Sequence, residues 1–228
     1  FAAGSAPGKG EFLSLPDTLE TQAELAGVTL HMNHSPSVDE LLESGAELIV
    51  LATGAHTATP PIPGLAGDPR VIDAVDLLEG TVLPGQRVVV LGGGPVGVEA
   101  ALYTARLGAI TPETAAFLLE HEAEEPARIR SLLLKGTKTV TMVEMTDKIG
   151  KGIGRSTRWV HLKELKMSEV AILTKTRAKA LLPEGLQIEN EQGESVLPLD
   201  SLVLATGMKS HDPYAGLETR TEAKVLRL

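Results

Sequence analysis

The 228-residue chain is long enough for one large domain or two small ones, and its 43% hydrophobic residues suit a folded protein with a buried core. Its net charge of −9, from 21 Lys and Arg against 30 Asp and Glu, argues against nucleic acid or an anionic membrane as a non-specific partner. The absence of cysteine excludes disulfides, cysteine metal sites and a redox dithiol from this stretch, and no apolar run is long enough to span a bilayer.

Four elements are expected in the first quarter of the chain. A helix is predicted over Glu11–Leu25, with Pro16 as a start or a break, and a short strand over Val28–Met32. Val38–Leu42 is expected to form a helical turn or two, capped by Ser37. The apolar run Leu48–Leu51 predicts a buried strand. We expect a cytoplasmic protein, which fits the absence of cysteine. We also expect a fragment of a longer protein, because the first residues are loop-like and Phe replaces the initiator Met.

The centre of the sequence is the stretch RVVVLGGGPVGVEAA. A helix is predicted over Val71–Leu78, a buried parallel strand over Arg87–Leu91, and a helix over Val96–Leu107 that stops at Gly108. Between strand and helix lies a glycine-rich turn, composed of Gly92, Gly93, Gly94, Pro95, Val96 and Gly97.

This order of strand, glycine turn and helix is the one that a dinucleotide site requires. Gly92 allows the tight turn, Gly94 lets a pyrophosphate approach the backbone, and Gly97 lets the helix pack closely on the strand. The free amide groups and the positive dipole end of the helix would face the phosphates. The alternative is a tight turn that serves packing alone.

Residues 110–138 form an insertion between the glycine turn and the next strand. Pro112 and Pro126 each start a helical pattern, which predicts a helical hairpin that is a lid, a subunit contact or a solvated elaboration. The strand Thr139–Glu144 follows, and the insertion makes its distance from Gly97 longer than the roughly 20 residues usual. Glu144 is placed to accept both ribose hydroxyls of the adenosine and to repel a 2′-phosphate, or it is an ordinary strand-end carboxylate. We assign its neighbour Met145 to the same cofactor site.

The last third of the chain contains one helix and five further strands. The helix is expected from Ser156 to Lys166, burying Trp159, Leu162 and Leu165. A strand is expected over Val170–Leu173. An antiparallel three-stranded meander follows, formed by Arg177–Leu182, Leu186–Asn190 and Ser195–Leu199. The last strand, Ser201–Leu204, is expected to return to the parallel sheet.

Two apolar runs end in the same three residues. LIVLATG closes at Gly54, and LVLATG closes with Ala205, Thr206 and Gly207. Small residues at a strand end let a backbone pass near a ligand or another strand. We prefer a duplicated nucleotide-binding architecture, with Ala205 to Gly207 in the cofactor site; the alternative is two similar buried strands.

Taken together, these motifs resemble a known family. GGGPVGVEAA, VTMVE, the meander, LVLATG, the early APGK and KIGKGIGRSTRW are similar to the C-terminal half of the 2,4-dienoyl-CoA reductase, enoate reductase and trimethylamine dehydrogenase family. The resemblance implies an α/β fold of the Rossmann-like FAD/NAD(P)-binding type, with a parallel sheet and the meander. It further implies an NAD(P)-binding domain over residues 84–207, inserted into a flanking FAD-binding domain of which residues 1–83 and 208–228 are parts.

The resemblance also implies a function. In such a protein NADH passes a hydride to FAD and on to a second flavin, which reduces an enoate or enoyl-CoA type substrate. NADH would bind to this segment; FAD, FMN and an iron–sulfur cluster are implied for the parent protein, whose barrel domain would be a partner. No catalytic residue and no metal site is assigned to this chain, because its six histidines lack metal-ligand spacing. The alternatives are a stand-alone nucleotide-sensing module and a flavoprotein of the thioredoxin reductase type, which keeps a Cys-x-x-Cys dithiol that this chain lacks.

Overall fold

The computed structural model describes residues 2–228, which form two compact units. The first contains the residues up to Leu13 and Thr57–Gly207; the second contains Ser14–His56 and Met208–Leu228. Residues 2–13 and 57–83 therefore group with the glycine turn, whereas we expected them in the flanking domain; the assignment of domains to cofactors remains a prediction.

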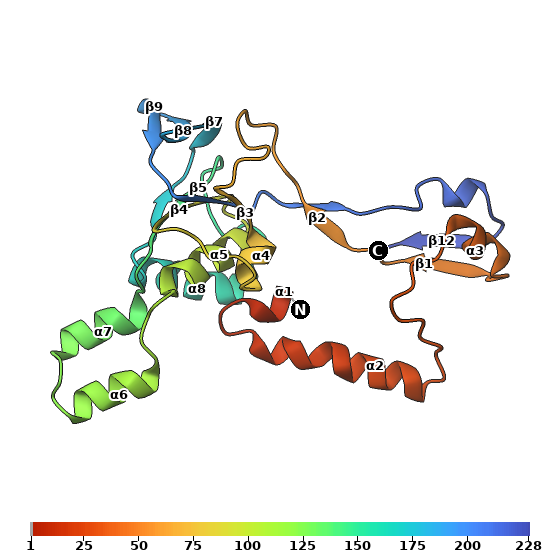
Figure 1. Ribbon diagram of the computed structural model, residues 1–228, viewed down its shortest axis with the longest axis horizontal. Coiled ribbons are helices and arrows are strands. Elements are labelled where there is room, and N and C mark those ends of the chain that lie inside the picture. Colours follow the sequence, from red (N-terminus) through yellow and green to blue (C-terminus); the bar gives the residue numbers. More distant parts are fainter. Residues whose placement is uncertain (1) are drawn as a thin grey trace. The chain divides into compact units, whose positions relative to one another are not determined.

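The first unit is built on a parallel five-stranded sheet (Figure 1). Its order is β3–β10–β4–β5–β6, with the strands Val71–Asp73, Ser201–Leu204, Arg87–Leu91, Thr139–Val143 and Ala171–Leu173. All four strands predicted for this sheet are present. The apolar runs of the central strands β4 and β10 are buried on both faces, because other elements pack over each face of the sheet.

Helices cover one face of this sheet and the meander covers the other (Figure 1). The helix-covered face packs α4 (Ala74–Leu78), α5 (Pro95–Arg106) and α8 (Arg155–Met167) against side chains such as Val90 and Met142. The opposite face packs β7 (Arg177–Leu182), β8 (Gly185–Asn190) and β9 (Gly193–Leu197) over Val89 and Leu202. The predicted fold class, a Rossmann-like parallel sheet with an antiparallel three-stranded meander, is thereby confirmed.

The insertion forms the expected helical hairpin, and Figure 1 shows it projecting from the rest of its unit. Its helices are α6 (Pro112–Glu120), which Thr111 caps through the amide of Thr114, and α7 (Pro126–Leu134). Within the described residues, none of the helices is long and apolar enough to cross a membrane.

The second unit is small. The parallel pair β1 (Leu48–Leu51) and β12 (Lys224–Arg227) packs Ile49 and Leu51 against α3 (Val38–Glu43) and the 3-10 turn Leu217–Thr219. Ser37 and Glu40 form the capping box that starts α3.

Three further elements precede α3, namely α1 (Ala2–Ser5), the 3-10 turn Gly10–Ser14 and α2 (Leu15–Leu25). A short sheet pairs β2 (Ala55–Thr57) with β11 (Met208–Ser210).

Several predicted elements were wrong in detail. Val28–Met32 forms no strand, because its alternating pattern finds no partner strand among the described residues. Val71–Asp73 is strand β3 rather than the start of a helix, and Asp73 caps α4 through the amide of Val75. β1 is buried on one face only, where Ile49 and Leu51 pack against α3 and Leu217, whereas Leu48 and Val50 on the other face are exposed.

The helix predicted from Ser156 also differs from the structure. It begins at Arg155, with Gly154 as its N-cap, and it extends to Met167. Leu165 is fully buried and Leu162 is partly buried against the core, but Trp159 is 62% exposed. The sequence pattern located the helix correctly but placed its aromatic side chain on the wrong face.

Candidate dinucleotide site

The glycine turn joins β4 to α5 at the carboxyl end of the sheet, the edge at which open α/β sheets bind ligands. Gly92 has a φ of +112°, and a Cβ there would overlap the carbonyl oxygen of Ala205. A Cβ at Gly97 would overlap the carbonyl oxygen of Gly92. These two glycines are therefore required by close packing, whatever the turn binds.

Gly94 differs from both. It has an ordinary φ of −71° as the N-cap of α5, and an ideal Cβ would meet no atom within 4 Å. The amides of Gly94, Val96 and Gly97 make no hydrogen bond within the described part of the chain. The open space over Gly94 thus lies beside unpaired donors at the positive end of a 12-residue helix, a combination that fits a bound pyrophosphate.

Glu144 lies next to the same turn. It follows β5 directly, and its carboxylate accepts hydrogen bonds from the amides of Gly93 (2.7 Å) and Thr146 (2.7 Å). A Cβ on Gly93 would lie 3.0 Å from Glu144 Oε2. The two bonds fix the carboxylate at the edge of the glycine turn, where it can accept from a ribose.

The segment after Glu144 closes over the turn. Gly150 donates its amide to the carbonyl of Gly93 (2.6 Å), and Ile149 contacts the same glycine. Arg158 holds this loop in place by donating through Nη2 (2.6 Å) and Nε (3.1 Å) to the carbonyl of Ile149. Sequence analysis missed Ile149, Gly150 and Arg158 as parts of this arrangement, although the run KIGKGIG, rich in glycine, marks a backbone that passes another one closely.

The remaining predicted site residues follow β10 and β5, the two strands on either side of β4. Ala205, at the end of β10, is 9% exposed and packs against Gly92 and Gly97. Thr206 donates its hydroxyl to the carbonyl of Ala58 (2.6 Å), and Gly207 has a φ of +107° with no atom within 4 Å of an added Cβ. Met145 is 70% exposed beside Glu144. The structure therefore brings the predicted cofactor residues to one edge of the sheet.

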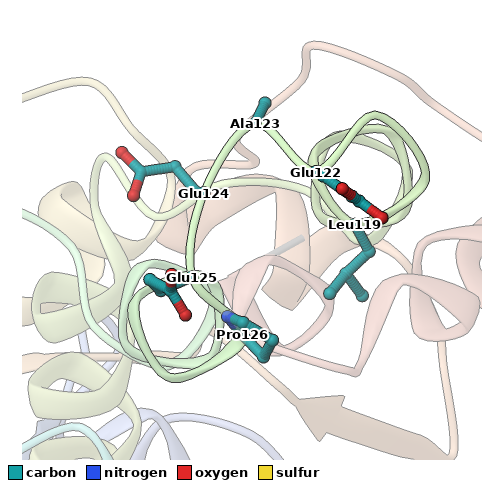
Figure 2. Close-up of a pocket in the computed structure, with 6 residues that line it drawn as sticks. All are labelled: Leu119, Glu122, Ala123, Glu124, Glu125 and Pro126. Atoms are coloured by element: carbon teal, nitrogen blue, oxygen red, sulfur yellow. The ribbon is translucent and has the colours of Figure 1, made fainter.

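A separate hollow lies at the tip of the α6–α7 hairpin and belongs to no strand end. Leu119, Glu122, Ala123, Glu124, Glu125 and Pro126 line it (Figure 2). Figure 2 shows the carboxylates of Glu122 and Glu124 on opposite sides of the connection, so they do not converge on a common point. Among the described residues, no group of three or more His, Asp or Glu side chains is arranged to hold a metal ion.

Known proteins match the chain over almost its whole length. The family described as pyridine nucleotide-disulphide oxidoreductase matches residues 17–226. A metal reductase of Desulforamulus reducens is 37% identical over 96% of this chain and 34% of its own length, and a bilirubin reductase of Mediterraneibacter gnavus is 29% identical over 89% of this chain and 27% of its own. The chain thus spans about a third of the length of these relatives.

Solved structures show the same fold. A 2-naphthoyl-CoA reductase superposes on the whole chain with a TM-score of 0.76 at 20% identity, over 30% of its own length. Histamine dehydrogenase from Rhizobium sp. 4-9 does so with a TM-score of 0.70 at 15% identity, over 34% of its length. By its fold, its glycine turn and the family match over residues 17–226, the chain belongs to the pyridine nucleotide-disulphide oxidoreductase family, whose domains bind FAD and NAD(P)H.

Proposed function

We propose that this chain is the NADH-binding part of a flavin-dependent oxidoreductase, with the cofactor site formed by residues 92–97, Glu144, Met145 and residues 205–207. The observation that carries the proposal is the contrast within the glycine turn. At Gly92 and Gly97, backbone atoms occupy the space that a side chain would need. At Gly94 that space is open, and it lies beside three unpaired amides. A turn built for packing alone would have no reason to leave that space beside free donors.

The residues of this chain bind and orient the dinucleotide. The α5 amides would hold the pyrophosphate, Glu144 would accept the ribose hydroxyls, and the turn at Gly207 would pass close to the far half of the molecule. When bound, NADH supplies a hydride and FAD accepts it.

For the parent protein we propose the longer electron path of the resembled family. The hydride would pass to FAD in a flanking domain that includes residues 14–56 and 208–228. The electrons would then pass to an FMN in a barrel domain, with an iron–sulfur cluster on the way, and reduce an enoate or enoyl-CoA type substrate. Support comes from relatives about three times as long, several of which are named reductases, and from the fold shared with 2-naphthoyl-CoA reductase.

Calorimetric titration with NADH and NADPH tests the cofactor assignment. NADH should bind more tightly, since Glu144 is placed to accept from the ribose and to repel a 2′-phosphate. Glu144→Ala should narrow the gap between the two affinities, and Glu144→Asp should preserve its direction. Equal or reversed affinities in the wild-type chain would count against the assignment.

A second measurement tests the placement of flavin chemistry outside this chain. In the described residues, only β4, residues 92–97 and α5 form a strand, glycine turn and helix in succession. We therefore expect the isolated chain to purify colourless, to hold no FAD, and to show no NADH oxidation with added quinone or dye acceptors. A yellow preparation with stoichiometric FAD would show that the flavin site lies within these 228 residues.

A further inference from the structure

The helix that would receive the pyrophosphate also carries a carboxylate in its second turn. Glu99 lies four residues after Pro95, and its side chain is only 16% exposed. It forms an ion pair with Lys9, whose side chain is 35% exposed and belongs to the same compact unit as α5. In the part of the chain that the structure describes, Lys9 is the only cation paired with Glu99.

The position of Glu99 makes its charge relevant to the glycine turn. Four residues of helix correspond to a rise of about 6 Å, and helical side chains lean back toward the N-terminus. The carboxylate therefore lies within about one turn of the unpaired amides of Val96 and Gly97. A negative charge there stabilises the empty helix end, but it repels a pyrophosphate that binds to the same end.

We propose that Lys9 is a positioning residue for dinucleotide binding, because its ammonium group neutralises Glu99 and keeps the N-terminal end of α5 attractive to the pyrophosphate. The inference rests on the proposed function and goes beyond it. It assigns a role to a residue outside the glycine turn, from a segment more than eighty residues earlier in the sequence.

Three single variants and one double variant separate this electrostatic role from a simple structural tether. Lys9→Gln leaves Glu99 uncompensated and should weaken NADH binding by about fivefold at low ionic strength, with a smaller effect in high salt. Lys9→Arg should bind like the wild type. Glu99→Gln, alone or combined with Lys9→Gln, should bind NADH at least as tightly as the wild type, because the repelling charge is gone.

The control is Lys135→Gln, which breaks the ion pair between Lys135 and Glu169, near the C-terminal end of α5 and so at the opposite end of that helix from the glycine turn. It should leave NADH affinity unchanged. Calorimetry gives the affinities, and thermal unfolding of each variant shows whether it folds.

The outcomes distinguish two failures. If the wild-type chain binds NADH and Lys9→Gln binds equally well, the role of Lys9 is overturned and the proposed function stands. If Glu99→Gln weakens binding as much as Lys9→Gln does, the pair is a structural tether and the electrostatic role is overturned. If the wild-type chain binds no NADH, the proposed function fails, and this inference fails with it.

Discussion

The two Ala-Thr-Gly strand ends show how one sequence pattern serves two environments. β10 and β1 both lead into Ala-Thr-Gly, and both glycines, Gly207 and Gly54, have a positive φ with open space around them. Each threonine hydroxyl donates to a backbone carbonyl far away in the sequence, Thr206 to that of Ala58 and Thr53 to that of His211. The backbone arrangement is therefore repeated.

The strands that lead into these ends differ in their surroundings. β10 has a partner on each side and is buried along its whole length, whereas β1 has the single partner β12 and buries alternate residues. Val203 is fully buried, and Val50, its counterpart, is 49% exposed. Side chains of a strand point to the two faces of its sheet, so the elements that pack over those faces, which the local sequence does not encode, decide how much each apolar side chain contributes to the core.

The matched substitutions Val203→Ala and Val50→Ala should give the largest difference. Removing two buried methyl groups at Val203 should lower the free energy of opening by about 2 kcal/mol, from lost burial and the cavity left behind. Val50→Ala should cost less than about 0.5 kcal/mol, since half of that side chain is already in water. Native-state hydrogen exchange at the amides of β10 and β1 measures each strand separately. Equal costs would show that the two strands are equally buried in solution.

Substitution of the two threonines, Thr206 and Thr53, should change the local opening free energy by smaller and more nearly equal amounts. Thr206→Val and Thr53→Val each remove one hydroxyl-to-carbonyl hydrogen bond at an exposed position. Each should cost about 1 kcal/mol in local opening free energy. Ser at either position keeps the hydroxyl and should restore most of the loss. A cost confined to one unit would argue against a repeated arrangement.

Acid should weaken an ion pair in the first unit and another in the second. Arg87, at the start of β4, forms an ion pair with Asp200 and lowers the pKa of that carboxyl to about 2 from 3.8. A depressed pKa stabilises the folded state above the unfolded value, so this stabilisation should be lost as the pH falls from about 4 to about 2. Thermal unfolding of wild type and Asp200→Asn should therefore differ at pH 7 and converge near pH 2.

In the second unit the corresponding cation is Arg227 of β12. The pKa of the Glu218 carboxyl is lowered first by a hydrogen bond from the backbone of Glu218 itself and then by a hydrogen bond from the guanidinium of Arg227. Glu218→Gln should also converge with wild type in acid, with a smaller shift in midpoint, since Arg227 keeps its second partner Asp212. A difference that persists at pH 2 would show that the substitution acts through something other than the carboxylate charge.

Much of the fold was accessible from the sequence where patterning and turn chemistry agreed. The apolar run Arg87–Leu91 followed by glycines could only be a buried strand before a tight turn, and the structure has it as β4. Val28–Met32 alternates as a strand does but has no partner strand, and Val71–Asp73 became a strand only because β10 lies beside it. Local sequence propensity does not reveal which strands will pair in the folded protein.

The candidate dinucleotide site could also be predicted in part from the sequence. Glycine spacing predicted the separate roles of the three glycines, and the structure has Gly92 and Gly97 in close backbone packing and Gly94 in open space. The assignment of Gly94 and Glu144 to a dinucleotide remains a prediction. Lys9 could not be linked to Glu99 from the sequence, since the contact joins segments far apart in the chain.

The most direct test of the account is a calorimetric titration of NADH into the wild-type chain and Gly94→Val. An added Cβ at Gly94 meets no protein atom within 4 Å, so the substitution should leave the unfolding midpoint nearly unchanged, but the side chain would occupy the approach of the pyrophosphate. We predict that NADH affinity falls by about tenfold or more in Gly94→Val, with a smaller loss in Gly94→Ala. Unchanged NADH affinity in a folded Gly94→Val variant would contradict the assignment of the glycine turn as the dinucleotide site.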